Sequence, residues 1–287
     1  MKKALLFGLL TVSLLLGMVG YSYLRFADGK LHVIFCDVGQ GDGILIKTPD
    51  RHIVIVDAGP DDSIRQCLAR HLPFWHRTID LAMLSHPHAD HFFGFFTLLD
   101  HFTIRSFVQE DIVNSSPEYQ ELSSAFEREA ISQKVVRPGD RWTIGAVSLR
   151  MVGPTDAYLK RITPDGTIDR CDGCPSLASV LSYGNFNLLL TGDTEFDAFD
   201  TIEAVLPENI AVMQIPHHGS RTGVNEDILE AIDPGLAVIS VGAENFYNHP
   251  HPSVLGILST QQIPVLRTDL VGDVEIVSDG EKWWVSK

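Results

Sequence analysis

The chain has 287 residues, of which 45% are hydrophobic and 21% charged. This balance is typical of a globular protein and excludes disordered, collagen-like and coiled-coil chains. With 22 basic and 37 acidic residues the formal net charge is −15, so strong non-specific binding of nucleic acid is not expected, because such binding needs a basic surface. Twelve histidines are the one compositional excess.

The first residues form a candidate membrane segment. Two lysines open the chain, and an uncharged apolar run follows from Ala4 to Leu24. At about 1.5 Å per helical residue this run spans roughly 30 Å, the thickness of a bilayer's hydrocarbon core. Residues 1–25 are therefore expected to be a transmembrane anchor or a cleaved signal peptide with Gly20-Tyr21-Ser22 as its cleavage site. The positive-inside rule then predicts an extracytoplasmic body, secreted or anchored to the membrane.

Residues 30–287 read as one domain, with strands first and mixed strands and helices afterwards, because no linker-like composition divides them. The predicted strands are Leu31–Asp37, Ile44–Lys47, His52–Val56, Ile79–Leu84, one within Trp142–Val152, Leu177–Leu181, Phe186–Leu190, Ala211–Ile215, Leu236–Val241 and closing strands to Val285. The predicted helices are Ser63–His71, Phe92–Leu99, Pro117–Gln133, Phe196–Leu206, Glu226–Ile232 and Ser253–Gln261.

The four cysteines fit an oxidising compartment. Cys36 and Cys67 lie in apolar strand-like or helical segments, where burial is expected. Cys171 and Cys174 form a Cys-Asp-Gly-Cys loop. A local disulfide is favoured there over a redox pair or a zinc knuckle, because no second pair of this kind is present to complete a tetrahedral site.

The decisive stretch is Ser-His-Pro-His-Ala-Asp-His, which follows a predicted strand directly. In an extended turn His86 and His88 project to the same side, and Asp90 and His91 fall at the start of the next helix. Imidazoles and a carboxylate at this density suit zinc or a similar divalent cation. The flanking residues are core-like, and burying these groups without a ligand would be costly. A metal site is therefore favoured over a histidine-rich surface loop.

Further ligand-type side chains follow other predicted strands. Any one of them could simply turn toward solvent at the end of its strand, but five such positions together favour a common site. A carboxylate among them could bridge two metal ions about 3.5–4 Å apart. These residues are Asp57, Asp193, His217, His218 and His249.

The pattern His86-x-His88-x-Asp90-His91 resembles the signature of the metallo-β-lactamase-fold hydrolases. Within that superfamily the chain is similar to the soluble hydrolase domain of the ComEC competence family. The shared stretches, which run in order over nearly the whole body, are Asp37–Asp42, Val56–Gly59, Ser85–His91, Leu190–Asp193, Pro216–Ser220, Ser240–Gly242 with Asn245 and His249-Pro250, and Arg267–Asp269.

The resemblance implies an α+β fold, a four-layer αββα sandwich with the site at one edge of its two sheets. It also implies two divalent metal ions, with Zn2+ as first choice and Mn2+ as the alternative. Asp57 would orient the metal-binding loop from behind. The implied metal ligands are His86 and His88 for one ion, Asp90, His91 and His218 for the other, and Asp193 as the bridge. The implied catalytic residues are Asp90, His217 and His249, with a ligand role left open for His249.

The chain departs from the superfamily pattern at one position that matters for the metals. Many members have a ligand histidine before the strand that here ends at Asp193. No histidine lies between His101 and His217, so one metal is a ligand short. That site is weaker, open or completed by another residue such as His249.

The expected function is hydrolysis by a metal-activated hydroxide, with a phosphodiester as the first choice because two metals suit in-line displacement at phosphorus. The expected substrate is a small phosphodiester or single-stranded nucleic acid. The N-terminal segment is expected to contact the membrane. The alternatives are hydrolysis of a lactone, amide or thioester, a non-catalytic metal-stabilised binding domain at the envelope, and a thiol redox protein that uses Cys171 and Cys174.

Overall fold

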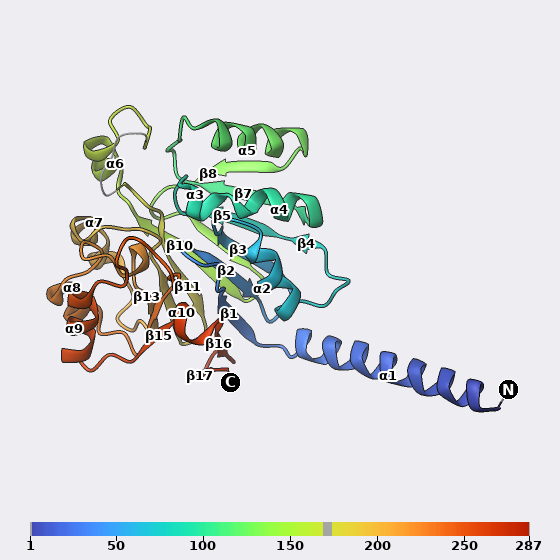
Figure 1. The fold of residues 1–287 in the computed structure, drawn as a ribbon. Helices are drawn as coiled ribbons and strands as arrows, with labels where there is room; N and C mark the ends of the chain where they lie inside the picture. Colours follow the sequence, from blue (N-terminus) through green and yellow to red (C-terminus); the bar gives the residue numbers. More distant parts are fainter. Residues whose placement is uncertain (1, 169–173, 287) are drawn as a thin grey trace.

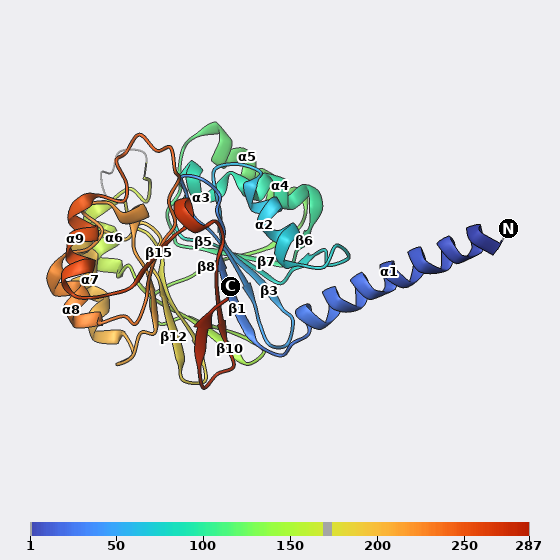
Figure 2. The same ribbon diagram turned by 60° about the horizontal axis from the view of Figure 1, so that its bottom comes forward.

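The computed structural model describes residues 2–168 and 174–286. One long helix projects from a body in which helices flank two sheets (Figures 1 and 2). The strands are β1 (Leu31–Phe35), β2 (Gly43–Lys47), β3 (Ile53–Ala58), β4 (Thr78–Ile79), β5 (Leu81–Leu84), β6 (Thr103–Ile104), β7 (Ser106–Gln109), β8 (Ser132–Val135), β9 (Arg141–Ile144), β10 (Val147–Gly153), β11 (Ala178–Tyr183), β12 (Phe186–Leu190), β13 (Val212–Gln214), β14 (Ala237–Ile239), β15 (Val265–Arg267), β16 (Val274–Ser278) and β17 (Trp283–Val285). The helices are α1 (Lys2–Phe26), α2 (Ser63–His71), α3 (Ala89–Phe92), α4 (Gly94–His101), α5 (Pro117–Arg128), α6 (Asp156–Ile162), α7 (Phe196–Ile202), α8 (Glu226–Ile232), α9 (Pro252–Thr260) and α10 (Thr268–Val271), with short 3-10 turns at Glu203–Val205 and His217–Gly219.

Two mixed sheets form the centre of the body. The first has the strand order β17-β16-β1-β2-β3-β5-β7-β8, and the second has the order β15-β14-β13-β12-β11-β10-β9. Alternation along β1 shows how the layers form. Val33 and Phe35 belong to the apolar cluster shared with strands of the second sheet. Ile34 and Cys36 belong to the cluster shared with α2, α4 and α5. Successive side chains of a strand point to opposite faces, so both faces of this sheet are covered.

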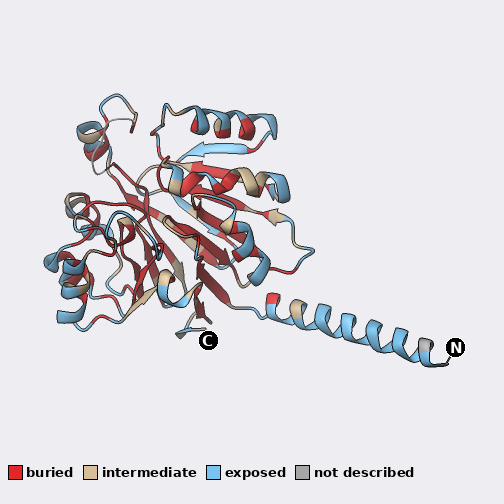
Figure 3. Cartoon of the chain, viewed as in Figure 1, coloured by how far each residue is buried: buried red, intermediate tan, exposed pale blue. Residues whose placement is uncertain are grey.

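The second sheet is covered in the same way. Its outer face packs on α7, α8 and α9 through a third apolar cluster that includes Phe199, Leu229 and Leu258. Buried residues, coloured red in Figure 3, run through the centre of both sheets. The layer order is therefore helix, sheet, sheet, helix, which confirms the predicted four-layer αββα sandwich.

A disulfide joins Cys36, just after β1, to Cys67 in α2. The predicted burial of both cysteines is correct, but their pairing was not foreseen, because they lie 31 residues apart. Closing a loop of this length stabilises the fold by about 3–4 kcal/mol in the chain-entropy model. The predicted Cys171–Cys174 disulfide involves a residue outside the described part of the chain and stays a prediction.

Three predicted helices have different bounds. The predicted helix Phe196–Leu206 is α7 followed by the 3-10 turn Glu203–Val205. The segment Pro117–Gln133 is not one helix: α5 ends at Arg128, Ala130 adopts a left-handed φ of 52°, and Ser132 begins β8. The predicted helix Phe92–Leu99 is divided into α3 and α4. The sequence patterns do not predict strands β6, β7 and β8 or helices α6 and α10.

Helix α1 contains an apolar span, Leu6–Phe26, that is long enough to cross a membrane and is not buried in the body. Its exposed surface is visible in Figure 3. Among the residues of α1 whose burial is described, its last residue, Phe26, is the buried one. The division into residues 1–25 as an anchor or signal peptide and 30–287 as the body stays a prediction.

Candidate metal centre

The candidate ligands gather at the carboxyl ends of parallel strands. β3 and β5 are parallel neighbours in the first sheet, and β12, β13 and β14 are parallel neighbours in the second. Parallel strands end at the same edge of a sheet, and the connections that follow them meet there. The structure therefore brings together Asp57 at the end of β3, the His86–His91 turn after β5, Asp193 after β12, and the His217-His218 turn after β13.

The two sheets approach each other closely at this edge. Gly192, which precedes Asp193, has a left-handed φ of 49°. A Cβ at Gly192 would lie 2.3 Å from Ser176 Oγ and 2.8 Å from Ser85 Cβ. Only glycine fits such an approach without strain. Because of this close contact, Asp193, which follows a strand of the second sheet, lies beside the histidines that follow a strand of the first sheet.

One group of donors consists of His86, His88 and Asp193. The Nε2 atom of His86 lies 2.8 Å from Nδ1 of His88 and 3.6 Å from Oδ2 of Asp193. All three ligand atoms lie within 4.8 Å of one another. His86 and His88 do project to the same side, as the extended turn predicts.

A second group consists of Asp90, His91, Asp193 and His218. Here Nε2 of His91 lies 3.3 Å from Oδ1 of Asp193, and Nε2 of His218 lies 3.4 Å from Oδ2 of Asp90 and 3.7 Å from Oδ1 of Asp193. Asp193 thus offers one oxygen to each group.

This second group contains buried polar atoms that have no hydrogen-bond partner. They are Nε2 of His91, Nε2 of His218 and Oδ1 of Asp193. Buried polar atoms are nearly always paired in folded proteins, and each exception needs an explanation. Two imidazole nitrogens and a carboxylate oxygen directed at one point have the chemistry of a divalent-metal site. The residues present therefore fit such a cation.

Hydrogen bonds on the far side of the rings direct the other nitrogens inward. The Nδ1 atom of His91 lies 2.8 Å from Oδ2 of Asp57 and the Nδ1 atom of His218 lies 3.0 Å from the carbonyl oxygen of Ser240. When Nδ1 donates in each case, Nε2 keeps its lone pair for a ligand. Metal-binding histidines generally have such a partner, because it fixes the tautomer and the ring orientation.

Asp57 has the position expected for a residue that orients the metal-binding turn. Its two oxygens accept hydrogen bonds from the backbone N–H and the hydroxyl of Ser85, at 2.7 and 2.6 Å. Asp57 itself has a left-handed φ of 56°, which aspartate tolerates better than most residues. It therefore ties both the start of the turn and His91 to the end of β3.

In the protein without metal, neighbouring charges favour a protonated imidazole beside an ionised carboxylate at the position where a cation would bind. Burial disfavours a charged imidazole at His218, but the carboxylates of Asp193 and Asp90 outweigh this and raise the pKa of His218 to about 9. Burial likewise opposes ionisation of Asp193, yet His91 and His218 hold the pKa of Asp193 well below its usual range. Metal ions displace protons from such ligands.

His217 and His249 line the same site. The Nε2 atom of His217 lies 3.7 Å from Oδ2 of Asp193, while its Nδ1 lies 2.8 Å from Oε1 of Glu195. His217 and His218 both have left-handed φ values, 52° and 54°, in the turn that directs the two rings at the site. The ring of His249 lies 5.6 Å from that of His217, and burial lowers the pKa of His249 to about 4.

Two buried acids at the site were not singled out in the sequence. Asp42 accepts a hydrogen bond from Nε2 of Gln214 at 2.8 Å, and its other oxygen lies 3.7 Å from Nδ1 of His218. Burial is the main cause that raises the pKa of Asp42 to about 6. Glu195 pairs with His217. Two features of the sequence could have indicated these acids. Asp42 has a glycine on each side, and Glu195 lies two residues after Asp193.

Fold and site together define a two-sheet sandwich protein with a histidine- and carboxylate-lined site at one edge. The chain belongs to the Metallo-beta-lactamase superfamily, whose family model matches residues 36–243.

Two curated relatives match most of the length of this chain. The chain is 27% identical over 267 residues to ComE operon protein 3 of Bacillus subtilis (strain 168), covering 87% of this chain and 33% of the relative. It is 27% identical over 267 residues to Competence protein ComA of Neisseria gonorrhoeae, covering 92% and 35%. The chain thus spans about a third of the length of these relatives. A solved structure of similar fold is Zn(2+)-bound PqqB from Methylobacterium extorquens, with a TM-score of 0.56, 13% identity, and coverage of 82% of this chain and 97% of that chain.

Proposed function

We propose that the chain is a binuclear metallohydrolase that cleaves phosphodiester bonds. The observation that carries this proposal is the shared position of Asp193, whose two oxygens face two separate groups of donors. Zn2+ is the first choice of metal, because imidazole and carboxylate ligands suit it and the PqqB neighbour has it bound, with Mn2+ as the alternative.

The proposed ligands follow the two groups of donors. His86 and His88 hold one metal, and Asp90, His91 and His218 hold the other, with Asp193 shared. His217 supplies the donor that the sequence leaves missing at the first metal, because its Nε2 approaches the same oxygen of Asp193 as does Nε2 of His86, at 3.7 and 3.6 Å. Its bond to Glu195 is the partner that a ligand histidine needs.

When bound by these residues, divalent cations would lower the pKa of a water molecule and neutralise negative charge that develops at phosphorus. The protein's own contribution is to hold the reacting groups and to move protons. Asp90 is the most exposed carboxylate of the site, and it accepts the proton released by the attacking water. His249 is neutral at pH 7 because of its lowered pKa, and it donates a hydrogen bond to the departing oxygen.

Exposed aromatic residues at the rim of the site favour the proposal that the substrate contains a nucleotide. Phe246 and Tyr247 are strongly exposed, and the ring of Tyr247 stacks on that of His249 at 5.8 Å. Exposed aromatic rings beside a catalytic site are suited to stacking with nucleobases. Stacking would allow an acidic body to bind a small phosphodiester or a single strand of nucleic acid, without the basic groove that strong non-specific binding requires.

The proposed location of the body, residues 30–287, is extracytoplasmic. Residues 1–25 serve as its membrane anchor in this proposal, supported by the apolar span of α1. Removal of the same segment as a signal peptide would leave a secreted body.

Metal analysis of the purified full chain, combined with hydrolysis of bis(p-nitrophenyl) phosphate, tests the proposal. We expect two metal ions per chain and turnover. Two metals with turnover only on a lactone, amide or thioester would replace the phosphodiester by that substrate class. Tightly bound metal with no turnover on any of these substrates would identify a non-catalytic binding domain.

A pair of histidine variants tests the roles given to His217 and His249. His217→Ala should lose one of the two metals as well as activity, because a ligand is removed. His249→Ala should keep both metals and lose activity, because only the hydrogen bond to the leaving group is removed. Equal metal content in the two variants would contradict the ligand role of His217.

A further inference from the structure

The end of α1 is held firmly against the body. Nζ of Lys47 donates to the carbonyl oxygen of Arg25 at 2.9 Å and to Oδ1 of Asp28 at 3.2 Å. The ring of Phe26 lies 5.0 Å from that of His76. The loop that contains His76 is therefore placed directly beside the point where the apolar span of α1 ends.

This loop connects α2 to β4 and carries two exposed aromatic side chains. Phe74 is 71% exposed and Trp75 is 39% exposed, and their rings contact each other edge to face at 5.0 Å. Figures 1 and 2 both show the loop extending from the body on the side from which α1 leaves. Tryptophan and other aromatic rings are favoured at the boundary between a bilayer and water, where they bury an apolar ring at headgroup depth.

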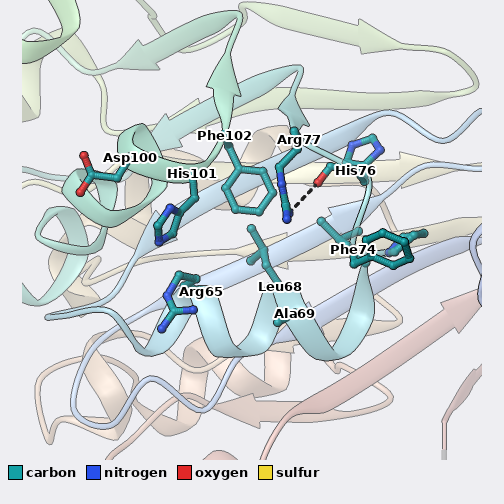
Figure 4. Close-up of a pocket in the computed structure, with 11 residues that line it drawn as sticks. Arg65, Leu68, Ala69, Phe74, His76, Arg77, Asp100, His101 and Phe102 are labelled. Carbon is teal, nitrogen blue, oxygen red and sulfur yellow. Dashed lines mark hydrogen bonds between the residues drawn. The ribbon is translucent and has the colours of Figure 1, made fainter.

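Basic side chains outnumber acidic ones in the cavity beside this loop. A cavity of 460 Å³ between α2 and α4 is lined by Arg65, Arg77, His76 and His101 and by a single acid, Asp100 (Figure 4). Arg77 is exposed and its guanidinium lies over the ring of Phe102, 5.8 Å from the centroid. Basic residues close to a membrane surface are attracted to anionic phospholipids by about 1 kcal/mol each.

We propose that Arg65, Phe74, Trp75 and Arg77, named here the anchor-side face, dock on the phospholipid surface of the membrane that α1 enters. The aromatic pair would insert at headgroup depth while the two arginines face anionic headgroups. Together with the fixed end of α1, this second contact would stop the body from turning freely about its anchor. The inference rests on the proposed anchoring of the chain by residues 1–25, and is independent of the catalytic proposal.

Quenching of tryptophan fluorescence by brominated lipid tests the docking. The full chain is reconstituted in vesicles of phosphatidylcholine and phosphatidylglycerol, with and without bromine on the acyl chains. The comparison uses Trp75→Phe and, as a matched control, Trp142→Phe, which changes a tryptophan in β9 that packs against the core between the sheets. We expect the wild type and Trp142→Phe to be quenched, and the quenching to be lost in Trp75→Phe. Arg77→Glu should weaken the quenching in vesicles that contain phosphatidylglycerol.

The outcomes separate the docking from the anchoring. Equal quenching in Trp75→Phe and Trp142→Phe, in a chain that stays in the vesicles through an alkaline carbonate wash, would overturn the docking and leave the anchor intact. Release of the wild-type chain by that wash would overturn the anchoring and the docking with it. Neither result depends on hydrolytic activity.

Discussion

The charged cluster beside the end of α1 and the metal centre differ in whether the protein itself supplies hydrogen-bond partners for their buried polar atoms. Beside the end of α1, His32 is bound on both sides, by Glu275 at 2.6 Å and by Asp28 at 2.8 Å, and Lys47 completes the cluster. Within the described residues, none of these four has a buried polar atom without a partner. At the metal centre, by contrast, atoms of His91, His218 and Asp193 have none.

The difference distinguishes a structural cluster from a binding site. Both clusters combine imidazoles with carboxylates, so composition alone would not tell them apart. Leaving buried polar groups unpaired costs free energy, and a protein retains them where something else supplies the missing partner. Three variants test this comparison.

The largest effect is expected for Asp193→Ala. Asp193 is the one ligand that both groups of donors share, so its loss should abolish binding of both metals. Hydrolysis should fall by at least about a thousand-fold, since metals contribute several kcal/mol of transition-state stabilisation. The control is Asp197→Asn, which changes a nearby acid paired with Arg161 and should keep both metals. Retention of two metals by Asp193→Ala would contradict the shared site.

A smaller effect is expected for Glu275→Gln in the cluster beside α1. Burial opposes ionisation of Glu275, but the hydrogen bond and charge of His32 outweigh it and lower the pKa of Glu275 from 4.5 to about 2. Because the folded-state pKa lies below the unfolded value, the stabilisation is present above about pH 4.5 and is lost as the pH falls toward 2. The substitution should lower the free energy of unfolding by up to about 3 kcal/mol at pH 7 without changing metal content.

Urea unfolding at pH 7 and at pH 3 measures this effect. The difference between the wild type and Glu275→Gln should shrink at the lower pH. Glu121→Gln is the matched control, because Glu121 pairs with Arg128 on the exposed surface of α5 and should contribute less than about 1 kcal/mol. A pH-independent difference would show that the carboxylate of Glu275 acts through packing rather than charge.

The smallest of the three effects is expected for Asp57→Asn. Asparagine tolerates the left-handed backbone of Asp57, so the fold should be kept. The amide cannot accept the same hydrogen bonds from His91 and Ser85, and the affinity for the second metal should fall by about 10–100-fold. Competition with a metal chelator measures the change. An unaltered affinity together with an unaltered melting temperature would show that Asp57 does not orient the ligands.

Local patterns predicted much of the fold and the nucleus of the site. The apolar runs Val33–Phe35 in β1, Leu81–Leu84 in β5 and Leu188–Leu190 in β12 were sufficient to predict strands. β8 was missed because its four residues are all exposed, so it has no apolar pattern to recognise. The end of α5 was missed because polar residues continue past Arg128 at helix-compatible positions, although Ala130 turns the backbone away.

The histidine-rich turn between β5 and α4 is a property of the sequence itself. Its four ligand-type residues lie within six positions, so backbone geometry alone brings His86 and His88 to one side. The partners of that turn depend on the tertiary structure. Asp57 meets His91 only because β3 and β5 are parallel neighbours, and Asp193 reaches both only because Gly192 lets the two sheets approach. The pairs Cys36–Cys67 and Glu195–His217 also depend on the tertiary structure. Their members come into contact only when separate elements pack together, so their spacing along the chain does not predict the contact.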